Sequence, residues 1–263
     1  MDLGLANKVI IVTGGAKGIG EGIAKLLAAE GAIPVIIGRN EEDNLKAAND
    51  IKAAGGKVFT ITAELTDPLE SERAVNAVLV VYGRIDGLVN NAGVNDGVGL
   101  EDGNYESFMA SLHKNVIHYY LLAHYALPAL KQSKGVILNI SSKLAETGQG
   151  GTSGYAAANG ARAALTREWA VELLKYGIRV NAVVVAECWT SLYEKWINTL
   201  PDPIAKRNEI EANIPLGKRM TTVEEIANTT VFLLSERSSH TTGQLIHVDG
   251  GYVHLDRALA KAE

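Results

Sequence analysis

TGGAKGIG, residues 13–20, is the stretch of sequence that decides the fold. It joins a β-branched apolar run, residues 9–12, to a run with helical spacing in which Ile23, Leu26 and Leu27 form one stripe. Glycines at a strand-to-helix turn let backbone N–H groups approach a pyrophosphate, and the helix N-terminus adds a partial positive charge. We therefore interpret the stretch as a dinucleotide-binding turn, although a glycine cluster taken alone also fits a plain tight turn.

Short apolar runs alternate with helical stretches along the rest of the chain. After residues 9–12, the runs are 35–37, 58–61, 88–89, 136–138, 180–185 and 245–248. Near-continuous apolar strands separated by helices indicate a parallel sheet covered on both faces. We predict an α/β fold, a doubly wound parallel seven-stranded sheet of Rossmann type with helices on both faces.

One large domain fits the length and composition, because 263 residues with 47% apolar content bury a sizeable core. We therefore predict a single dinucleotide-binding and catalytic domain over residues 1–263. The alternation lapses at residues 190–222, which are polar and aromatic and contain three prolines, Pro201, Pro203 and Pro215. We predict that this segment is an inserted substrate lid over the carboxyl edge of the sheet.

Several partner classes are not expected. The formal charge of −5, with no Lys/Arg run longer than a pair, argues against nucleic acid. No apolar run reaches the roughly 18 residues of a membrane helix, and the N-terminus lacks a basic-then-apolar leader, so we expect a cytoplasmic protein without membrane contact. Cys188 is the one cysteine, which excludes an internal disulfide, and the absence of Cys/His clusters at ligand spacing predicts no metal site.

Four further motifs follow the glycine-rich turn in order: NNAG at residues 90–93, NISS at 139–142, TG at 242–243 and VDGG at 248–251. In sequence and spacing, the chain resembles the short-chain dehydrogenase/reductase family over essentially its whole length. The resemblance implies an NAD(P)-dependent oxidoreductase that interconverts a secondary alcohol and a carbonyl on a small molecule. It also implies a homotetramer built partly on the helices at residues 104–130 and 156–176.

The catalytic set of that family is Asn, Ser, Tyr and Lys. Matching by position gives Asn115, Ser142 and Tyr155, with Asn159 in the Lys position. Hydride transfer to a carbonyl needs a proton donor at the developing alkoxide, and Tyr155 is the candidate. By resemblance, Ser142 holds the substrate oxygen and Asn115 positions a water that relays protons. Without the matched spacing, a serine at a strand end reads as a turn residue and a helical tyrosine as core.

Asn159 lies one helical turn after Tyr155, so both side chains share a face. A lysine there grips the nicotinamide ribose and its charge favours tyrosinate, whereas Asn159 carries no charge. We therefore expect severely impaired turnover with cofactor binding largely retained. Lys143 and Arg162 are the other nearby cations, and we expect both to be structural or solvated. The alternative function is a dinucleotide-binding protein or inactivated variant without useful catalysis.

The end of the second strand, IGRN at residues 37–40, bears on cofactor choice. Gly38 occupies the position where an acid would bind the adenosine ribose diol, and Arg39 and Lys17 are two cations that favour NADP(H), with NAD(H) as the alternative. The predicted cofactor-binding residues are Gly14, Lys17, Gly18, Ile19, Gly20, Arg39, Glu64, Leu65, Asn91, Ala92, Gly93, Tyr155, Asn159 and Thr190.

The substrate pocket is predicted from family topology to include Asn95, Glu146, Gln149, Glu187, Trp189 and Tyr193. Carboxylates and amides beside aromatic faces suit a sugar or polyol. Residues 148–154 and 186–190 are similar to the family's sugar dehydrogenases, particularly those that oxidise L-fucose-type sugars. The alternatives are ordinary polar loop residues and a 3-oxoacyl or steroid-like ketone substrate. After residues 180–183 the family commonly has Pro-Gly, where this chain has Val185 and Ala186.

Overall fold

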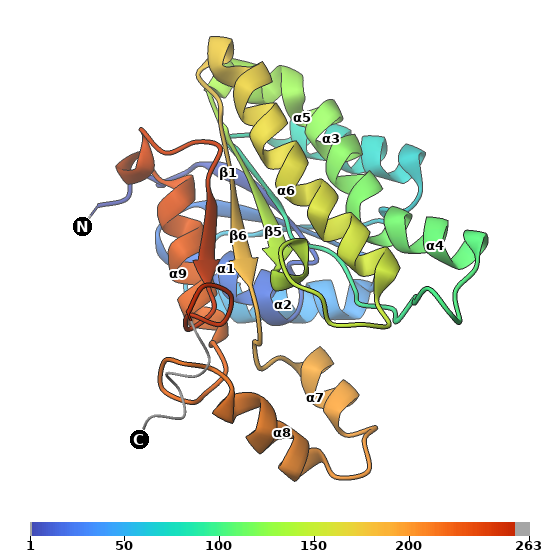
Figure 1. The fold of residues 1–263 in the computed structure, drawn as a ribbon. Coiled ribbons are helices and arrows are strands. Elements are labelled where there is room, and N and C mark those ends of the chain that lie inside the picture. The colour runs from blue at the N-terminus through green and yellow to red at the C-terminus, as the bar shows by residue number, and fades with distance from the viewer. Residues whose placement is uncertain (1, 256–263) are drawn as a thin grey trace.

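Seven parallel strands form one sheet in the order β3-β2-β1-β4-β5-β6-β7 in the computed structural model, which describes residues 2–255 (Figure 1). The strands are β1 (Val9–Thr13), β2 (Ile33–Gly38), β3 (Phe59–Thr62), β4 (Gly87–Asn90), β5 (Val136–Ser142), β6 (Arg179–Val185) and β7 (Leu245–Val248). The strand order reverses between β1 and β4, and in open parallel sheets ligands bind at the carboxyl ends of strands beside such a reversal. The predicted fold class is confirmed.

Helices cover both faces of the sheet. They are α1 (Gly18–Ala29), α2 (Glu41–Ala53), α3 (Pro68–Tyr82), α4 (Tyr105–Leu112), α5 (His118–Ser133), α6 (Ser153–Leu173), α7 (Ser191–Ile197), α8 (Pro203–Ala212) and α9 (Val223–Leu234). Figure 1 shows α3, α5 and α6 on one face and α1 and α9 on the other. Each face of the sheet has its own apolar core, and successive side chains of β1 point to opposite faces. Val9 and Ile11 pack in the core under α3, α5 and α6, whereas Ile10 and Val12 pack in the core under α1 and α9.

Local capping explains where several helices begin and end. Asn40 accepts a hydrogen bond from the backbone N–H of Asp43 at the start of α2, and Thr222 forms a capping box with Glu225 at the start of α9. Gly83 ends α3 with a left-handed φ of 66°, a conformation that glycine adopts without steric cost. These caps set where α2 and α9 begin and where α3 ends.

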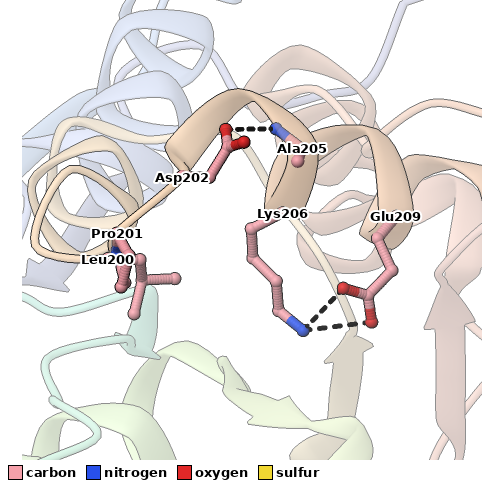
Figure 2. A pocket seen from close by; sticks show the side chains of 6 residues that line it. All are labelled: Leu200, Pro201, Asp202, Ala205, Lys206 and Glu209. Atoms are coloured by element: carbon pink, nitrogen blue, oxygen red, sulfur yellow. Dashed lines mark hydrogen bonds and ion pairs between the residues drawn. The ribbon is translucent and has the colours of Figure 1, made fainter.

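The segment 190–222 contains α7 and α8, which lie beyond the arrowheads of β5 and β6 in Figure 1. Asp202 begins α8 by accepting a hydrogen bond from the backbone N–H of Ala205 at 2.9 Å, and Lys206 pairs with Glu209 (Figure 2). A hollow of about 350 Å³ there is lined by Leu200, Pro201, Asp202, Ala205, Lys206 and Glu209. It is formed within this segment alone, apart from the predicted catalytic residues. Over residues 2–255, no helix is long and apolar enough to cross a membrane.

Candidate active site

The glycine-rich turn and the NNAG motif are bonded to each other at the carboxyl ends of β1 and β4. The Thr13 hydroxyl accepts hydrogen bonds from the backbone N–H groups of Asn91 at 2.8 Å and Ala92 at 2.9 Å. The Asn91 amide donates in return to the Thr13 carbonyl at 2.8 Å. Two motifs almost eighty residues apart in sequence therefore form one rigid floor where the strand order reverses.

Glycine is required inside this floor. A Cβ at position 20 would lie 2.3 Å from the Gly14 carbonyl oxygen and 2.5 Å from the Asn91 amide nitrogen. Gly14 and Gly18 have φ of 62° and 55°, and a Cβ on Gly18 would lie 3.3 Å from the Thr190 methyl group, so Thr190 lies against the turn. Lys17 makes no side-chain capping bond at the start of α1, which leaves the first N–H groups of the helix for a ligand. This cradle fits a dinucleotide pyrophosphate.

The remaining predicted contacts around the adenosine end are more exposed. Ile19 packs against the apolar core, so only its backbone faces the turn. Lys17 pairs with Asp43 at 2.6 Å, and Arg39, 79% exposed, lies 3.9 Å from Glu64. Leu65 is buried beside Glu64. A Cβ on Gly38 would lie 2.5 Å from the Asn44 side-chain oxygen, so an acid at this position would displace Asn44.

Ser142 and Tyr155 come from elements that pack together at the same edge. Ser142 ends β5 and accepts a hydrogen bond from the Leu144 backbone N–H at 3.3 Å, which begins the 3-10 turn η2 (Lys143–Ala145). Tyr155 lies in the first turn of α6, which packs against η2 and β5. Both side chains are half-buried. The arrangement leaves a hydroxyl and a phenol at the carboxyl edge.

Asn115 is fully buried in the π-helical turn η1 (His113–Ile117) between α4 and α5. Its side-chain oxygen accepts from the Val94 backbone N–H at 2.8 Å, and its amide nitrogen donates to the Ser111 carbonyl at 3.0 Å. Its own carbonyl accepts from Arg162 Nε at 2.7 Å. Asn115 thus ties the chain after the NNAG motif to α6, and these bonds could not be predicted from spacing along the chain.

Asn159 is fully buried, and both ends of its amide are bonded inside the protein. The nitrogen donates to the Tyr155 carbonyl at 2.8 Å, and the oxygen accepts from Arg162 NH1 at 3.0 Å. The helical spacing to Tyr155 is as expected, but the amide turns toward its own helix and Arg162. In this conformation the Asn159 side chain has no exposed surface on which to present its second N–H to a ribose hydroxyl.

Arg162 is the cation nearest to this position. It is 3% exposed, and its guanidinium carbon lies 4.4 Å from the Tyr119 ring centroid and 5.9 Å from that of Tyr155. In the described part of the chain it donates only to carbonyl and amide oxygens, including the Ile140 carbonyl at 3.2 Å. Of the two expectations for Arg162, structural or solvated, the structure supports the first, because the guanidinium is buried and bonded inside the protein beside the Tyr155 ring.

The buried charge of Arg162 affects the surrounding groups. Burial lowers the pKa of His118 to about 4, and the Arg162 charge acts in the same direction. Burial raises the pKa of Tyr119 to about 12, against the opposing effect of Arg162. A Cβ on Gly93 would lie 2.8 Å from Arg162 NH2, so the last residue of the NNAG motif has to be small for the guanidinium to fit.

Lys143 is also buried, so of the two expectations for this side chain, structural or solvated, the structure again supports the first. It forms an ion pair with Glu187, and its ammonium lies 4.2 Å from the Tyr252 ring centroid. The Tyr193 hydroxyl donates to the other Glu187 oxygen at 2.8 Å, and burial together with that carboxylate raises the pKa of Tyr193. Sequence reasoning placed Glu187 and Tyr193 in the pocket but missed Lys143, although its position directly after Ser142 was a usable signal.

Of the other four predicted substrate residues, only Trp189 lies near Glu187 and Tyr193. Trp189 lies under the Arg207 guanidinium at 4.2 Å and 6.1 Å from the Tyr193 ring, so α7 and α8 reach this group of side chains. The Glu146 carboxylate is bonded to His247 at 2.9 Å. Asn95 and Gln149 are exposed. The structure therefore brings Glu187, Trp189 and Tyr193 together and leaves the other three outside that group.

Comparisons with known proteins show which family the chain belongs to. A family model described as enoyl-(acyl carrier protein) reductase matches residues 14–253. The chain is 35% identical to L-fucose dehydrogenase of Bos taurus, over 98% of this chain and 94% of that one. It is 37% identical to the 3-oxoacyl-[acyl-carrier-protein] reductase of Thermotoga maritima, over 95% and 99%.

A solved structure shows the same relationship. The crystal structure of Cj0485 dehydrogenase superposes with a TM-score of 0.93 at 48% identity, covering 98% of this chain and 99% of that one. A family match over nearly the whole length, together with the dinucleotide cradle and the Ser142–Tyr155 edge, leads to one conclusion. The chain belongs to the short-chain dehydrogenase/reductase family of oxidoreductases.

Proposed function

We propose that the protein interconverts a secondary alcohol and a carbonyl on a sugar or polyol with NADP(H), and that Arg162 supplies the positive charge that Asn159 lacks. The observation that carries this proposal is the buried guanidinium, 5.9 Å from the Tyr155 ring and bonded to Asn159. A cation at this distance in a partly buried site favours a negative phenol oxygen. The positive charge of Arg162 lies three positions further along α6 than the family's lysine position, and it is still beside Tyr155.

The residues divide the chemistry as follows. The glycine cradle and Thr190 would hold NADP(H), which would supply or accept the hydride when bound. Tyr155 transfers the proton at the substrate oxygen, and Ser142 holds that oxygen through its hydroxyl. Asn115 positions α6 and the chain after the NNAG motif through its bonds to Arg162 and Val94. The burial of Arg162 excludes water from its charge and keeps that charge effective.

Turnover is lower than it would be with lysine at position 159. The Arg162 donors are directed at protein oxygens, and the Asn159 amide is bonded to Tyr155 and Arg162. Both side chains are buried in these bonds, so in this conformation neither presents a donor where a nicotinamide ribose would lie, and orientation contributes to the rate. A protein that binds the dinucleotide without useful turnover is the competing proposal.

The NADP(H) preference rests on Arg39 and Lys17. Each lies beside one carboxylate, and the Arg39 contact is long and exposed, so reorientation toward a 2′-phosphate costs little. Arg39 can bind a phosphate through two parallel hydrogen bonds. The crowding between position 38 and Asn44 supports the same preference, because an acid there would disturb the α2 start.

A sugar or polyol suits the charged and aromatic groups around Lys143. Lys143, Glu187 and Tyr193 present hydrogen-bonding groups, and the Trp189 ring offers an apolar face, with α7 and α8 acting as the lid. The similarity to L-fucose dehydrogenase supports this class of substrate. The similarity to a 3-oxoacyl reductase favours the second candidate, a 3-oxoacyl ketone, but an ion pair is a poor surface for an acyl chain.

Turnover of sugars, polyols and 3-oxoacyl thioesters should be measured with both dinucleotides for three chains: the parent, Arg162→Met, and Asn159→Lys combined with Arg162→Met. We expect the parent to turn over a sugar or polyol, Arg162→Met to lose most of that rate, and the double variant to exceed the parent. If no chain turns over any substrate while all bind NADPH, the binding-protein proposal replaces this one. If only thioesters react, the substrate class is wrong.

We also propose a cytoplasmic homotetramer. Large apolar side chains are exposed on the helices predicted to form its interfaces, including Tyr105 on α4, Tyr120 on α5 and Val171 on α6. Exposed apolar side chains that line adjacent helices support burial against another copy. Light scattering coupled to gel filtration tests this, and a monomeric mass would contradict it.

A further inference from the structure

Two histidines and a glutamate meet beside the Lys143 ion pair. Glu146 directly follows η2, His247 lies in β7, and His254 lies in the last described turn. Glu146 Oε1 is 2.9 Å from His247 Nε2, and Glu146 Oε2 is 3.7 Å from His254 Nε2. The three side chains can each offer one ligand atom such that all three atoms lie within 4.8 Å of one another.

The turn after β7 is built so that His254 returns over His247. The buried Asp249 carboxylate accepts hydrogen bonds from the backbone N–H groups of Gly251 at 2.8 Å and Val253 at 2.9 Å. Gly250 and Gly251 have φ of 64° and 83°, which glycine adopts without strain. The two imidazole rings consequently lie 4.3 Å apart and perpendicular. The backbone, and not only two exposed side chains, sets their relative position.

We propose that Glu146, His247 and His254 bind a zinc ion. Two imidazoles and one carboxylate are a donor set that zinc takes with three protein ligands and a water in the fourth position. Zinc bonds of about 2.0–2.1 Å in tetrahedral geometry place ligand atoms about 3.3 Å apart. The observed separations of 2.9 and 3.7 Å lie on either side of that value. Small rotations of the side chains therefore complete the site.

The three proposed ligands differ in solvent exposure, which suits a metal with one open coordination position. The His247 side chain is 16% exposed and that of Glu146 is 30% exposed, whereas His254 is 61% exposed. Two ligands are thus held by the protein surface, and the third closes the site from the solvent side. The metal fastens the C-terminal turn to the loop that follows Ser142. The same turn carries Tyr252, whose ring covers the Lys143 ammonium, so the ion stabilises one wall of the substrate region.

The prediction of no metal site rested on residue spacing, and spacing along the chain could not find this cluster. Glu146 and His247 are 101 residues apart, and the pairing of β5 with β6 and of β6 with β7 brings them together. The cysteine offers no competing ligand, because burial raises the pKa of Cys188 to about 12 and keeps the thiol protonated.

The test is zinc binding by the full chain without a polyhistidine tag, stripped with a chelator and titrated calorimetrically with zinc chloride. We expect one zinc per chain, and at least tenfold weaker binding for both His254→Gln and Glu146→Gln. His240→Gln is the matched control, because it removes an exposed histidine that precedes β7, outside the cluster, and should leave the affinity unchanged. Circular dichroism verifies that each variant is folded.

Cobalt(II) gives a second readout that a merely structural role of the side chains would not produce. The cobalt-loaded chain should show the strong visible absorption of a tetrahedral site, and both ligand variants should lose it. Absence of zinc binding by the parent, or equal affinities for the parent and both ligand variants, would overturn the proposal. The readouts are independent of turnover, so failure of the proposed activity does not affect them.

Discussion

Replacing Arg162 by methionine removes the buried charge beside Tyr155 while keeping a long apolar side chain against Tyr119. The guanidinium lies 5.9 Å from the Tyr155 ring centroid. At an effective dielectric constant of about 20, two unit charges about 6 Å apart interact by about 3 kcal/mol, which sets the scale of the effect on charge that develops at the phenol oxygen during proton transfer. Since about 1.4 kcal/mol corresponds to a tenfold change in rate, we expect kcat to fall by about 100-fold.

The same substitution also has a structural cost that the assay has to separate. It leaves the carbonyls of Asn115 and Ile140 and the Asn159 side-chain oxygen without their Arg162 donor. A buried acceptor left unsatisfied costs about 1–3 kcal/mol, partly offset because a buried charge is removed as well. Arg162→Lys is the matched control, since lysine keeps the charge but makes fewer of these bonds.

Steady-state turnover with NADP(H) and the best sugar or polyol measures kcat, and NADPH fluorescence measures cofactor binding separately. We expect Arg162→Met to bind NADPH within threefold of the parent and Arg162→Lys to retain more activity than Arg162→Met. A folded Arg162→Met chain whose kcat stays within threefold of the parent would refute the reasoning. Equal losses in the Met and Lys variants would show that packing, and not charge, is responsible.

Three other predictions follow from single contacts. Gly20→Ala should weaken NADPH binding at least tenfold in a fluorescence titration, because the new Cβ would lie 2.3 Å from the Gly14 carbonyl oxygen. Gly160→Ala is the control and should leave NADPH binding unchanged, because no atom lies within 4 Å of its new Cβ. Arg39→Ala should weaken NADPH binding about tenfold and leave NADH binding unchanged, since one charge-assisted contact to a phosphate is lost; an equal effect on both would contradict the assignment. The pKa of His118 is lowered from 6.5 to about 4 by burial, so the unfolded chain takes up a proton first as the pH falls. Stability from this group is therefore present above pH 6.5 and falls by about 3 kcal/mol toward pH 4, and urea unfolding should show a smaller pH dependence for His118→Gln.

The sheet and its cofactor cradle could be predicted because their signals are local. The glycine-rich turn lies between a β-branched run and an amphipathic helix. The pattern of a few consecutive residues is enough to predict the strand, the turn and the helix. The NNAG motif was matched to the family by sequence, and the carboxyl ends of parallel strands share one edge. The bonds between Thr13 and Asn91 join the motif to the glycine-rich turn at that edge.

The side-chain network around Tyr155 could not be predicted in the same way. Helical spacing placed Asn159 on the Tyr155 face, but it does not determine where the amide turns, and here it bonds to its own helix and to Arg162. Arg162 reaches Asn115, 47 residues away, and Lys143 reaches Glu187, 44 residues away. Both side chains were expected to be structural or solvated, and spacing along the chain could not decide between the two. Charged side chains are mostly exposed, and only the folded chain supplies the buried oxygens that hold these two inside the protein.

Moving the cation from position 159 to position 162 separates two tasks that one lysine performs. A lysine at 159 acts on the phenol and the ribose together, so its charge and its grip on the cofactor cannot be altered independently. Arg162 approaches Tyr155 from inside the protein and is held by Asn115 and Ile140, so its charge is in place whether or not a dinucleotide is bound. Loss of Arg162 should therefore lower kcat with little change in the KM for NADP(H), whereas loss of the glycine cradle should raise KM first. If Arg162→Met changed both kcat and the KM for NADP(H), Arg162 would act on the cofactor as well as on Tyr155, and this argument would be wrong.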